Sequence, residues 1–366
     1  MRAAILHQLD APLDVTEVEI DGPRAGEVRV RVEAAGVCHS DLSIVDGRIP
    51  FPLPCVMGHE GAGVVTEVGD GVTRVREGDH VIVSWVAMCG RCFYCTHRQP
   101  QLCQSGMGAF GTMADGTTRL RLGDTALRHG LNAATFAEQT IVRETAVVPI
   151  PADVPLAVAA LVGCGVTTGV GAAIRTAAVE PGERVAVIGC GGVGLSVIQA
   201  CRLAGATTII AIDPVASRRG AALRFGATHA LEAGDSVRAA AKPLTDGIGP
   251  DVVFEVVGLP TLQRQAFELA RPGGRVILVG VGSPHSETSF NTMFLTVAER
   301  VIRGCFYGSA YPDRDFPWIL EMYRAGRLDL DALVTQTLPL ERINEAFDAM
   351  RAGEQLRTVI RVATPP

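Results

Sequence analysis

One stretch limits the possible folds of this chain more than any other: RVAVIGCGGVGLSVIQACRLAGATTIIAID, residues 184–213. It contains an apolar strand pattern, a glycine-rich turn, a helical pattern and a second apolar strand. The same alternation continues through DVVFEVVG, TLQRQAFELARPGG and RVILVGV. Strands that alternate with helices predict right-handed crossovers and a parallel sheet.

The turn GCGGVG, residues 189–194, fits the dinucleotide-binding pattern G-x-G-x-x-G between a strand and a helix. Gly189 would permit the tight turn, Gly191 would let a pyrophosphate approach, and Gly194 would let helix and strand pack closely. The helix N-terminus would offer N–H groups to the phosphates. A tight turn without a ligand is the alternative. The predicted loop also includes Gly192 and Val193.

A carboxylate ends the second strand of this unit. Asp213 follows Gly194 by 19 residues, where an acid would accept hydrogen bonds from the adenosine ribose. Its charge would repel a 2′-phosphate, so NAD is favoured over NADP. Arg218 and Arg219 keep NADP open, because arginines accommodate that phosphate.

The chain before this unit is β-rich. EVRVRVEAAGV, residues 27–37, alternates valine with charged residues, which is the period of a half-buried strand. After about residue 305 mixed elements return, with helices predicted at DFPWILEMYRAGRL and LERINEAFDAMRAG. A chain of 366 residues is longer than one hydrophobic core usually grows. We therefore predict an α/β protein in which a doubly wound parallel-sheet domain interrupts a β-rich domain.

Charge and hydropathy limit the partners. The net charge of −6 argues against a nucleic-acid partner. Residues 154–174 carry no charge and could span a bilayer by length, but their glycines, threonines and proline favour a buried helix. The apolar patch near the N-terminus is too short for a signal-peptide core. We expect a soluble, cytoplasmic protein without a membrane partner.

Four of the ten cysteines lie in MCGRCFYCTHRQPQLC, residues 88–103. A reducing compartment disfavours a disulfide framework. The spacing C-x2-C-x2-C-x7-C lets four thiolates close a tetrahedron around Zn²⁺ and leaves no open position. An iron–sulfur cluster uses similar spacing, and a disulfide pair or unconnected thiols are further alternatives. The cysteines are Cys89, Cys92, Cys95 and Cys103.

A second set of possible ligands is dispersed: Cys38 in GVCHSD, His59 and Glu60 in GHEGAG, and Cys164 in GCGVTTG. Spacing alone does not connect them. Taken singly, each residue has an alternative to metal binding: Cys164 could be a small buried hydrophobic residue, and His59 could be a hydrogen-bonded histidine of the core. Three protein ligands with one open position would, however, make a catalytic zinc site.

In their order and spacing, GHEGAGVVTEVGDGV, the four-cysteine lobe, GCGVTTG and VIGCGGVG make the chain resemble the zinc-dependent medium-chain alcohol dehydrogenases along nearly its whole length. The resemblance implies a GroES-like catalytic domain, residues 1–165 and 306–366, with a structural zinc lobe at 88–104. It places a Rossmann NAD-binding domain at residues 166–305. The implied reaction is reversible hydride transfer from a primary or apolar alcohol to NAD⁺, giving an aldehyde or ketone.

The resemblance also implies the metal ligands. Cys38, His59 and Cys164 would hold a catalytic zinc, and the four clustered cysteines would hold a structural zinc. Asp41 would hydrogen-bond His59 and fix the ring. Glu60 would lie beside the metal and exchange with a zinc ligand.

Further roles follow from the same resemblance. The metal would lower the pKa of the alcohol, and Ser40 would accept its proton. Many relatives have a histidine three residues further on, where this chain has Ser43, so the proton route would differ. His39 and Arg357 match positions that contact the coenzyme pyrophosphate, and a solvated loop histidine is the alternative for His39.

Substrate specificity is less determined. Relatives that oxidise the formaldehyde adduct of glutathione carry an acid where Ile49 stands and an arginine where Met107 stands. Their absence counts against glutathione, but CGRC, GCGV and FYG also resemble mycothiol-dependent formaldehyde dehydrogenases, which is the second reading. A non-catalytic dinucleotide-binding protein is the third. The apolar side chains that would line the substrate pocket are Ile49, Trp85, Phe110, Phe136 and Val281. Ordinary core packing is the alternative for each of them. Val281 is also assigned to the coenzyme site.

Relatives with a long segment at residues 104–135 tend to be dimers. We therefore expect a homodimer, with VIRGCFYG as a candidate interface strand.

Overall fold

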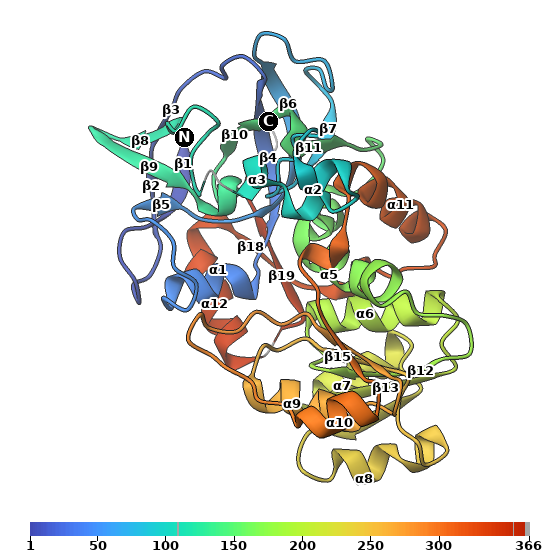
Figure 1. The fold of residues 1–366 in the computed structure, drawn as a ribbon. Helices are drawn as coiled ribbons and strands as arrows, with labels where there is room; N and C mark the ends of the chain where they lie inside the picture. Colours follow the sequence, from blue (N-terminus) through green and yellow to red (C-terminus); the bar gives the residue numbers. More distant parts are fainter. Residues whose placement is uncertain (108–109, 354, 363–366) are drawn as a thin grey trace. The chain divides into compact units, whose positions relative to one another are not determined.

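The computed structural model of the protein describes residues 1–107, 110–353 and 355–362. The chain separates into two compact units (Figure 1). The first contains Met1–Gly165, Tyr311–Tyr323 and Leu330–Pro366. The second contains Val166–Ala310 and Arg324–Asp329.

The first unit is built on two sheets. The smaller sheet has the strand order β2-β1-β5-β9-β8-β3. The larger sheet has the order β11-β7-β6-β4-β19-β18, and β10 pairs with β4 outside this path. The strands of the smaller sheet are β1 (Arg2–Leu6), β2 (Asp14–Glu17), β3 (Glu19–Ile20), β5 (Cys55–Val56), β8 (Leu120–Leu122) and β9 (Thr125–His129). Those of the larger sheet are β4 (Glu27–Gly36), β6 (Glu60–Val68), β7 (His80–Val83), β10 (Gln139–Arg143), β11 (Val147–Pro149), β18 (Val334–Pro339) and β19 (Arg357–Arg361).

Strand β4 is the centre of the larger sheet. It forms where the sequence predicted a strand from its alternating valines, and its valines Val28, Val30 and Val32 are fully buried. It pairs with β6 on one side and with the C-terminal strand β19 on the other. The last described strand, β19, therefore belongs to the same sheet as β4, which precedes it by more than 300 residues.

The second unit contains one six-stranded parallel sheet, in the order β14-β13-β12-β15-β16-β17. Counted along the unit, this order is 3-2-1-4-5-6, which is the order of a doubly wound dinucleotide-binding fold. The order reverses between β12 and β15, and ligands of such sheets bind at that edge. The strands are β12 (Arg184–Ile188), β13 (Thr208–Asp213), β14 (His229–Glu232), β15 (Val252–Glu255), β16 (Arg275–Leu278) and β17 (Val301–Gly304). The predicted fold class is confirmed.

The longest α-helix of the first unit is α11, with 13 residues, and that of the second unit is α6, with 12. Both predicted C-terminal helices form, as α11 and α12. The helices are α1 (His39–Val45), α2 (Phe93–Thr96), α3 (Gln104–Met107), α4 (Leu156–Leu161), α5 (Thr167–Gly171), α6 (Gly192–Leu203), α7 (Ala216–Arg224), α8 (Val237–Ala241), α9 (Pro260–Leu269), α10 (Thr292–Val297), α11 (Pro312–Arg324) and α12 (Ile343–Ala352).

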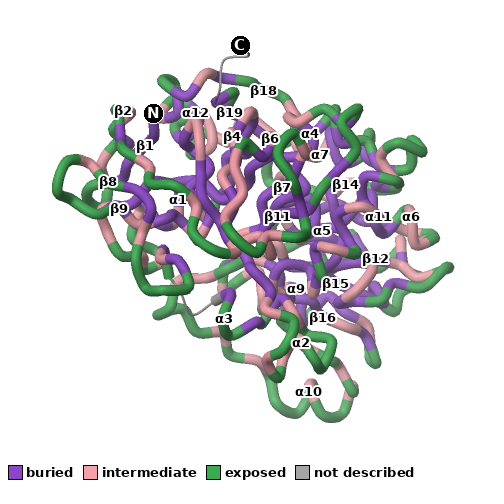
Figure 2. The backbone as a smooth tube through the Cα atoms, turned by 90° about the horizontal axis from the view of Figure 1, so that it is seen from above, coloured by how far each residue is buried: buried purple, intermediate pink, exposed green. Residues whose placement is uncertain are grey.

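The uncharged segment near residue 160 forms one continuous helical run, Leu156–Ala177, which contains two π-helical turns. Among the described residues it is the one helix long and apolar enough to cross a membrane. Its most apolar window is 83% buried inside the protein, as in the core helix that the sequence predicted. Figure 2 shows buried residues along central strands such as β12 and β15, while many connecting loops are exposed. The strands β2 and β17 at the ends of their sheets are mostly exposed or half-buried.

Candidate active site

Four possible metal ligands meet in the first unit. Cys38 precedes α1, Glu60 begins β6 directly after His59, and Cys164 lies in the π-helical turn Val162–Val166. One ligand atom from each of the four lies within 4.8 Å of the others. All four side chains are buried. The fold thus joins positions that sequence spacing could not connect.

The orientation of His59 is fixed by a buried carboxylate. Its Nδ1 lies 2.9 Å from Oδ1 of Asp41, and the other carboxylate oxygen accepts a hydrogen bond from the backbone N–H of Cys38 at 3.3 Å. An Nδ1–H that donates to Asp41 leaves Nε2 with a free lone pair. That Nε2 is buried and has no hydrogen-bond partner among the described residues. Such an atom fits a metal ligand.

The two thiols of the cluster are coupled. A hydrogen bond from Cys164 lowers the pKa of Cys38 well below its usual value against the effect of burial, and His59 lowers it further. The same hydrogen bond and burial raise the pKa of Cys164. Thiolate and imidazole nitrogen are the ligands that zinc prefers. The residues present therefore fit a zinc ion.

Glu60 has a partner that the sequence did not predict. Its carboxylate forms an ion pair with Arg357 of β19, and both side chains are buried. The guanidinium of Arg357 is thus engaged with Glu60. Its expected contact with the coenzyme pyrophosphate stays a prediction. Sequence reasoning missed the pair because the two residues are 297 positions apart.

The predicted proton-transfer residues lie beside the cluster. Ser40 is half-buried, and its Oγ is 3.8 Å from Sγ of Cys38. Ser43, one turn further along α1, is also half-buried, and His39 is exposed. Cys38 and the first turns of α1 thus supply a candidate ligand, a hydroxyl at the cluster and a second hydroxyl beyond it.

The four clustered cysteines form a separate group. Their sulfur atoms lie within 4.8 Å of one another, and Sγ of Cys92 is 3.9 Å from Sγ of Cys103. A tetrahedral zinc with Zn–S bonds of about 2.3 Å separates its sulfurs by about 3.8 Å. Backbone N–H groups donate to two of the sulfurs, and such a bond from Arg91 lowers the pKa of Cys89 to about 6. All ten cysteines are free thiols.

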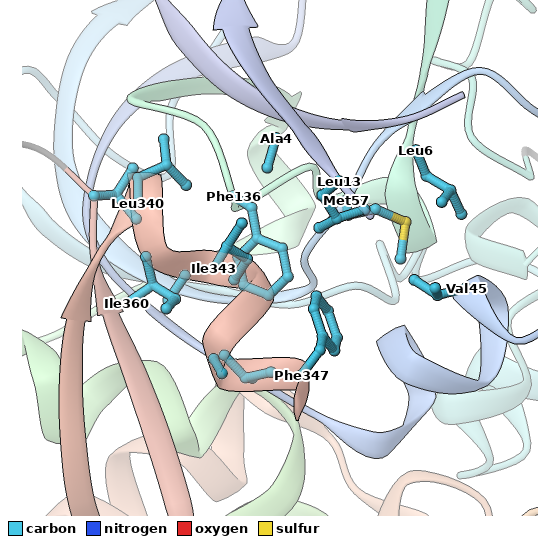
Figure 3. Packing of buried hydrophobic residues seen from close by; sticks show 14 of the residues in the cluster. Ala4, Leu6, Leu13, Val45, Met57, Phe136, Leu340, Ile343, Phe347 and Ile360 are labelled. Carbon is cyan, nitrogen blue, oxygen red and sulfur yellow. The ribbon is translucent and has the colours of Figure 1, made fainter. Parts of the chain in front are cut away.

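The predicted pocket residues do not form one group. The ring of Trp85 meets His59 edge-on, with 6.3 Å between centroids. Phe136 is fully buried in a hydrophobic core with Phe347 and Ile343 (Figure 3), and Ile49 packs against the same core. These contacts are those of core residues. Phe110 is 53% exposed, near the ring of Phe51. The Met107 side chain lies outside the described residues.

In the second unit, the glycine-rich loop has the expected geometry. Gly189 has φ +97°, which favours glycine, and a Cβ on Gly194 would overlap the carbonyl oxygen of Gly189. A Cβ on Gly191 would meet nothing within 4 Å. Gly192 and Val193 open α6. The turn is therefore tight where strand and helix meet and open where a phosphate would approach.

The carboxylate of Asp213 lies at the same edge of the sheet. It accepts hydrogen bonds from the N–H of Cys190 at 2.8 Å and of Val215 at 2.9 Å. Arg219 donates to the backbone carbonyls of Asp213 and Pro214. Arg218 is half-buried, and Val281 is 65% exposed.

Glu255, which sequence reasoning passed over, ends β15 next to β12. Its Oε1 accepts hydrogen bonds from Val257 and Gly258, its Oε2 has no partner among the described residues, and burial raises its pKa. An acid at the end of the apolar run DVVFE was the available signal.

Comparison with known proteins agrees with this architecture. Residues 24–152 match the family model of the alcohol dehydrogenase GroES-like domain, and residues 192–325 match that of the zinc-binding dehydrogenases. The chain is 39% identical to the NDMA-dependent alcohol dehydrogenase of Amycolatopsis methanolica over 98% of both proteins. It is 39% identical to the class-3 alcohol dehydrogenase of Cereibacter sphaeroides over 98% of this chain and 99% of the relative.

Comparison with a solved structure indicates the same family. The benzyl alcohol dehydrogenase of Acinetobacter calcoaceticus superposes with a TM-score of 0.93 at 32% identity, covering 99% of each chain. The fold, the matched domains and these relatives agree on one assignment. The chain belongs to the zinc-dependent medium-chain alcohol dehydrogenases.

Proposed function

We propose that the protein is an NAD-dependent alcohol dehydrogenase that oxidises primary or apolar alcohols and uses a catalytic and a structural zinc. The observation that carries the proposal is the unpartnered Nε2 of His59 beside the sulfurs of Cys38 and Cys164. Zinc held there would act as a Lewis acid on an alcohol oxygen.

The chain's own residues have distinct tasks in this proposal. Asp41 orients His59 and keeps its Nδ1 protonated. Ser40 accepts the alcohol proton, and its 3.8 Å distance from Sγ of Cys38 supports this role. A serine hydroxyl is a poor base at neutral pH, so Ser40 takes up the alcohol proton only as it gives up its own, and Ser43 passes that proton outward through water.

NAD is the proposed coenzyme because Asp213 stands where a ribose would bind and would repel a 2′-phosphate. Arg219, the competing signal for NADP, donates to backbone carbonyls. The glycine-rich loop and the start of α6 would receive the pyrophosphate. His39, Arg218, Val281 and Arg357 are assigned to the same coenzyme.

We also propose a cytoplasmic homodimer. Strand β17 ends the parallel sheet, so one of its edges has no neighbour among the described strands. Val301 on this strand is 51% exposed. Both features favour pairing with a second copy.

Two measurements test the proposal. Elemental analysis should find two zinc ions per wild-type chain, one for each cluster, and one zinc ion per chain in Cys164→Ala. Purified protein should then reduce NAD with short and long primary alcohols and benzyl alcohol, with NADP and NDMA as alternative acceptors. Activity with formaldehyde only when a low-molecular-weight thiol is present would favour the thiol-dependent reaction instead. Wild-type protein whose zinc content is the same as that of Cys164→Ala would contradict both the alcohol reaction and the thiol-dependent reaction, since each needs the zinc at this cluster.

A further inference from the structure

The carboxylate of Glu60 lies where two partners compete for it. It is close enough to Cys38, His59 and Cys164 to be a fourth protein ligand of their metal. In the structure both of its oxygens are occupied by N–H donors. Oε1 accepts from the backbone N–H of Gly165 at 3.1 Å, and Oε2 accepts from Nη2 of Arg357.

The cost of separating this pair is high. Arg357 is buried, with 7% of its surface exposed, and its Nε has no hydrogen-bond partner among the described residues. If Glu60 moved to the metal, the guanidinium would remain as a buried, unpaired charge. Breaking a buried ion pair in this way is strongly unfavourable, because it leaves one charge without a partner. The pair therefore holds Glu60 back from the metal.

Two glycines make room for the pair. A Cβ on Gly36, the last residue of β4, would overlap Oε2 of Glu60 and lie 3.0 Å from Nη2 of Arg357. A Cβ on Gly165 would lie 2.6 Å from Nη1 of Arg357. Both distances are shorter than normal contacts, so any larger residue must displace the pair.

Backbone conformation does not explain these glycines. Gly36 and Gly165 are absent from the glycines with positive φ, so their φ values suit any residue. Neither lies in a turn between strands: Gly36 is in β4 and Gly165 is in a π-helical turn. Space for the neighbouring side chains is the remaining reason for glycine at both positions.

We propose that Gly36 and Gly165 are positioning residues that let Arg357 hold Glu60 away from the catalytic zinc, so that the zinc keeps one position open for substrate. This inference rests on the proposed zinc site. Alanine at either glycine pushes the carboxylate and the guanidinium apart, and Glu60 then becomes the fourth protein ligand.

The test uses cobalt(II)-substituted protein and imidazole as a probe of the open position. In wild type, imidazole should change the visible cobalt spectrum, and Cys164→Ala should abolish that change. Gly36→Ala and Gly165→Ala should weaken imidazole binding by on the order of 10-fold or more and slow the transfer of metal to a chelator. Gly22→Ala is the matched control, because its Cβ would meet only Oε1 of Glu67, at 3.8 Å.

A second substitution separates positioning from general damage. In Gly36→Ala/Glu60→Gln, the neutral amide is a poor zinc ligand, so imidazole binding should recover. If Gly36→Ala does not fold, Gly165→Ala and Arg357→Lys are tested instead, since lysine lacks the Nη2 donor that holds the carboxylate. Folded variants that bind imidazole like wild type would overturn the proposal. Failure of wild type itself to show the imidazole response would instead overturn the zinc site.

Discussion

The Nδ1 atom of His59 lies 2.9 Å from Oδ1 of Asp41, and both side chains are only 1% exposed. Burial raises the pKa of Asp41, and its contact with His59 opposes that shift. The carboxylate thus holds the imidazole in one orientation and one tautomer, with Nε2 directed to the cysteine sulfurs. A weaker hydrogen-bond acceptor at position 41 would fix neither the orientation nor the tautomer of the imidazole as firmly.

Asp41→Asn should therefore weaken zinc binding at this cluster by about 10- to 100-fold, as loss of such partners does in other metal sites. Competition with a chelator measures the affinity. Asp14→Asn is the control, because Asp14 contacts His7 at 3.4 Å on the surface. Equal zinc affinity in Asp41→Asn and Asp14→Asn would contradict the role given to Asp41.

Cys164→Ala should abolish turnover while the protein stays folded, because the substitution removes one of the proposed zinc ligands from a short helical turn. Activity with alcohol and NAD, circular dichroism and zinc content give the three readouts. Full residual activity would show that Cys164 is not a ligand.

Cys95→Ser should act on stability rather than on chemistry. A weakened four-thiolate site should lower the thermal midpoint by roughly 5 to 10 °C and reduce solubility. Turnover per folded molecule should change little. A slower turnover at unchanged stability would mean that the lobe takes part in the reaction.

Asp213→Asn keeps the shape of the side chain and removes its charge. The ratio of kcat/KM for NADP to that for NAD should rise by about tenfold, equivalent to about 1.4 kcal/mol. Asp246→Asn is a suitable control, since the Asp246 side chain is 90% exposed. An unchanged ratio would mean that Arg218 and Arg219 determine the coenzyme.

His129 gives the first unit a pH-dependent stability. Burial, assisted by the charge of Arg119, lowers the pKa of His129 to about 4, whereas an unfolded histidine titrates near 6.5. Between these values the unfolded chain binds more protons, so stability falls as the pH falls. The loss from this residue between pH 7 and pH 4 should be about 3 kcal/mol. Denaturant unfolding at several pH values should show that His129→Gln does not lose this stability as the pH falls. His7→Gln should still lose it, because the His7 imidazole is exposed.

Sequence alone was sufficient for features set by local pattern. The parallel sheet follows from apolar strands that alternate with helices, and the positive φ of Gly189 follows from its place between strand and helix. The resemblance added the grouping of Cys38, His59 and Cys164, which spacing could not give. The structure now places those atoms together.

Long-range packing was not predictable in the same way. The pairing of Arg357 with Glu60 depends on β4, which pairs with β19 on one side and with β6 on the other, and no local pattern encodes it. Phe136 was assigned to a pocket, but it packs with Phe347 in the core. A phenylalanine has the same residue pattern in either place, and only the neighbouring elements decide between them.

The positions of the proposed metal ligands along the chain also imply an order of assembly during synthesis. The four-cysteine group closes a loop of 14 residues, whereas the other cluster must join Cys38 to Cys164 across 126. The longer closure costs about 2 kcal/mol more in chain entropy. The lobe can therefore take up zinc from a growing chain well before the second cluster exists. Glu60 gains the counter-charge of Arg357 only after synthesis has reached β19, the last of the described strands.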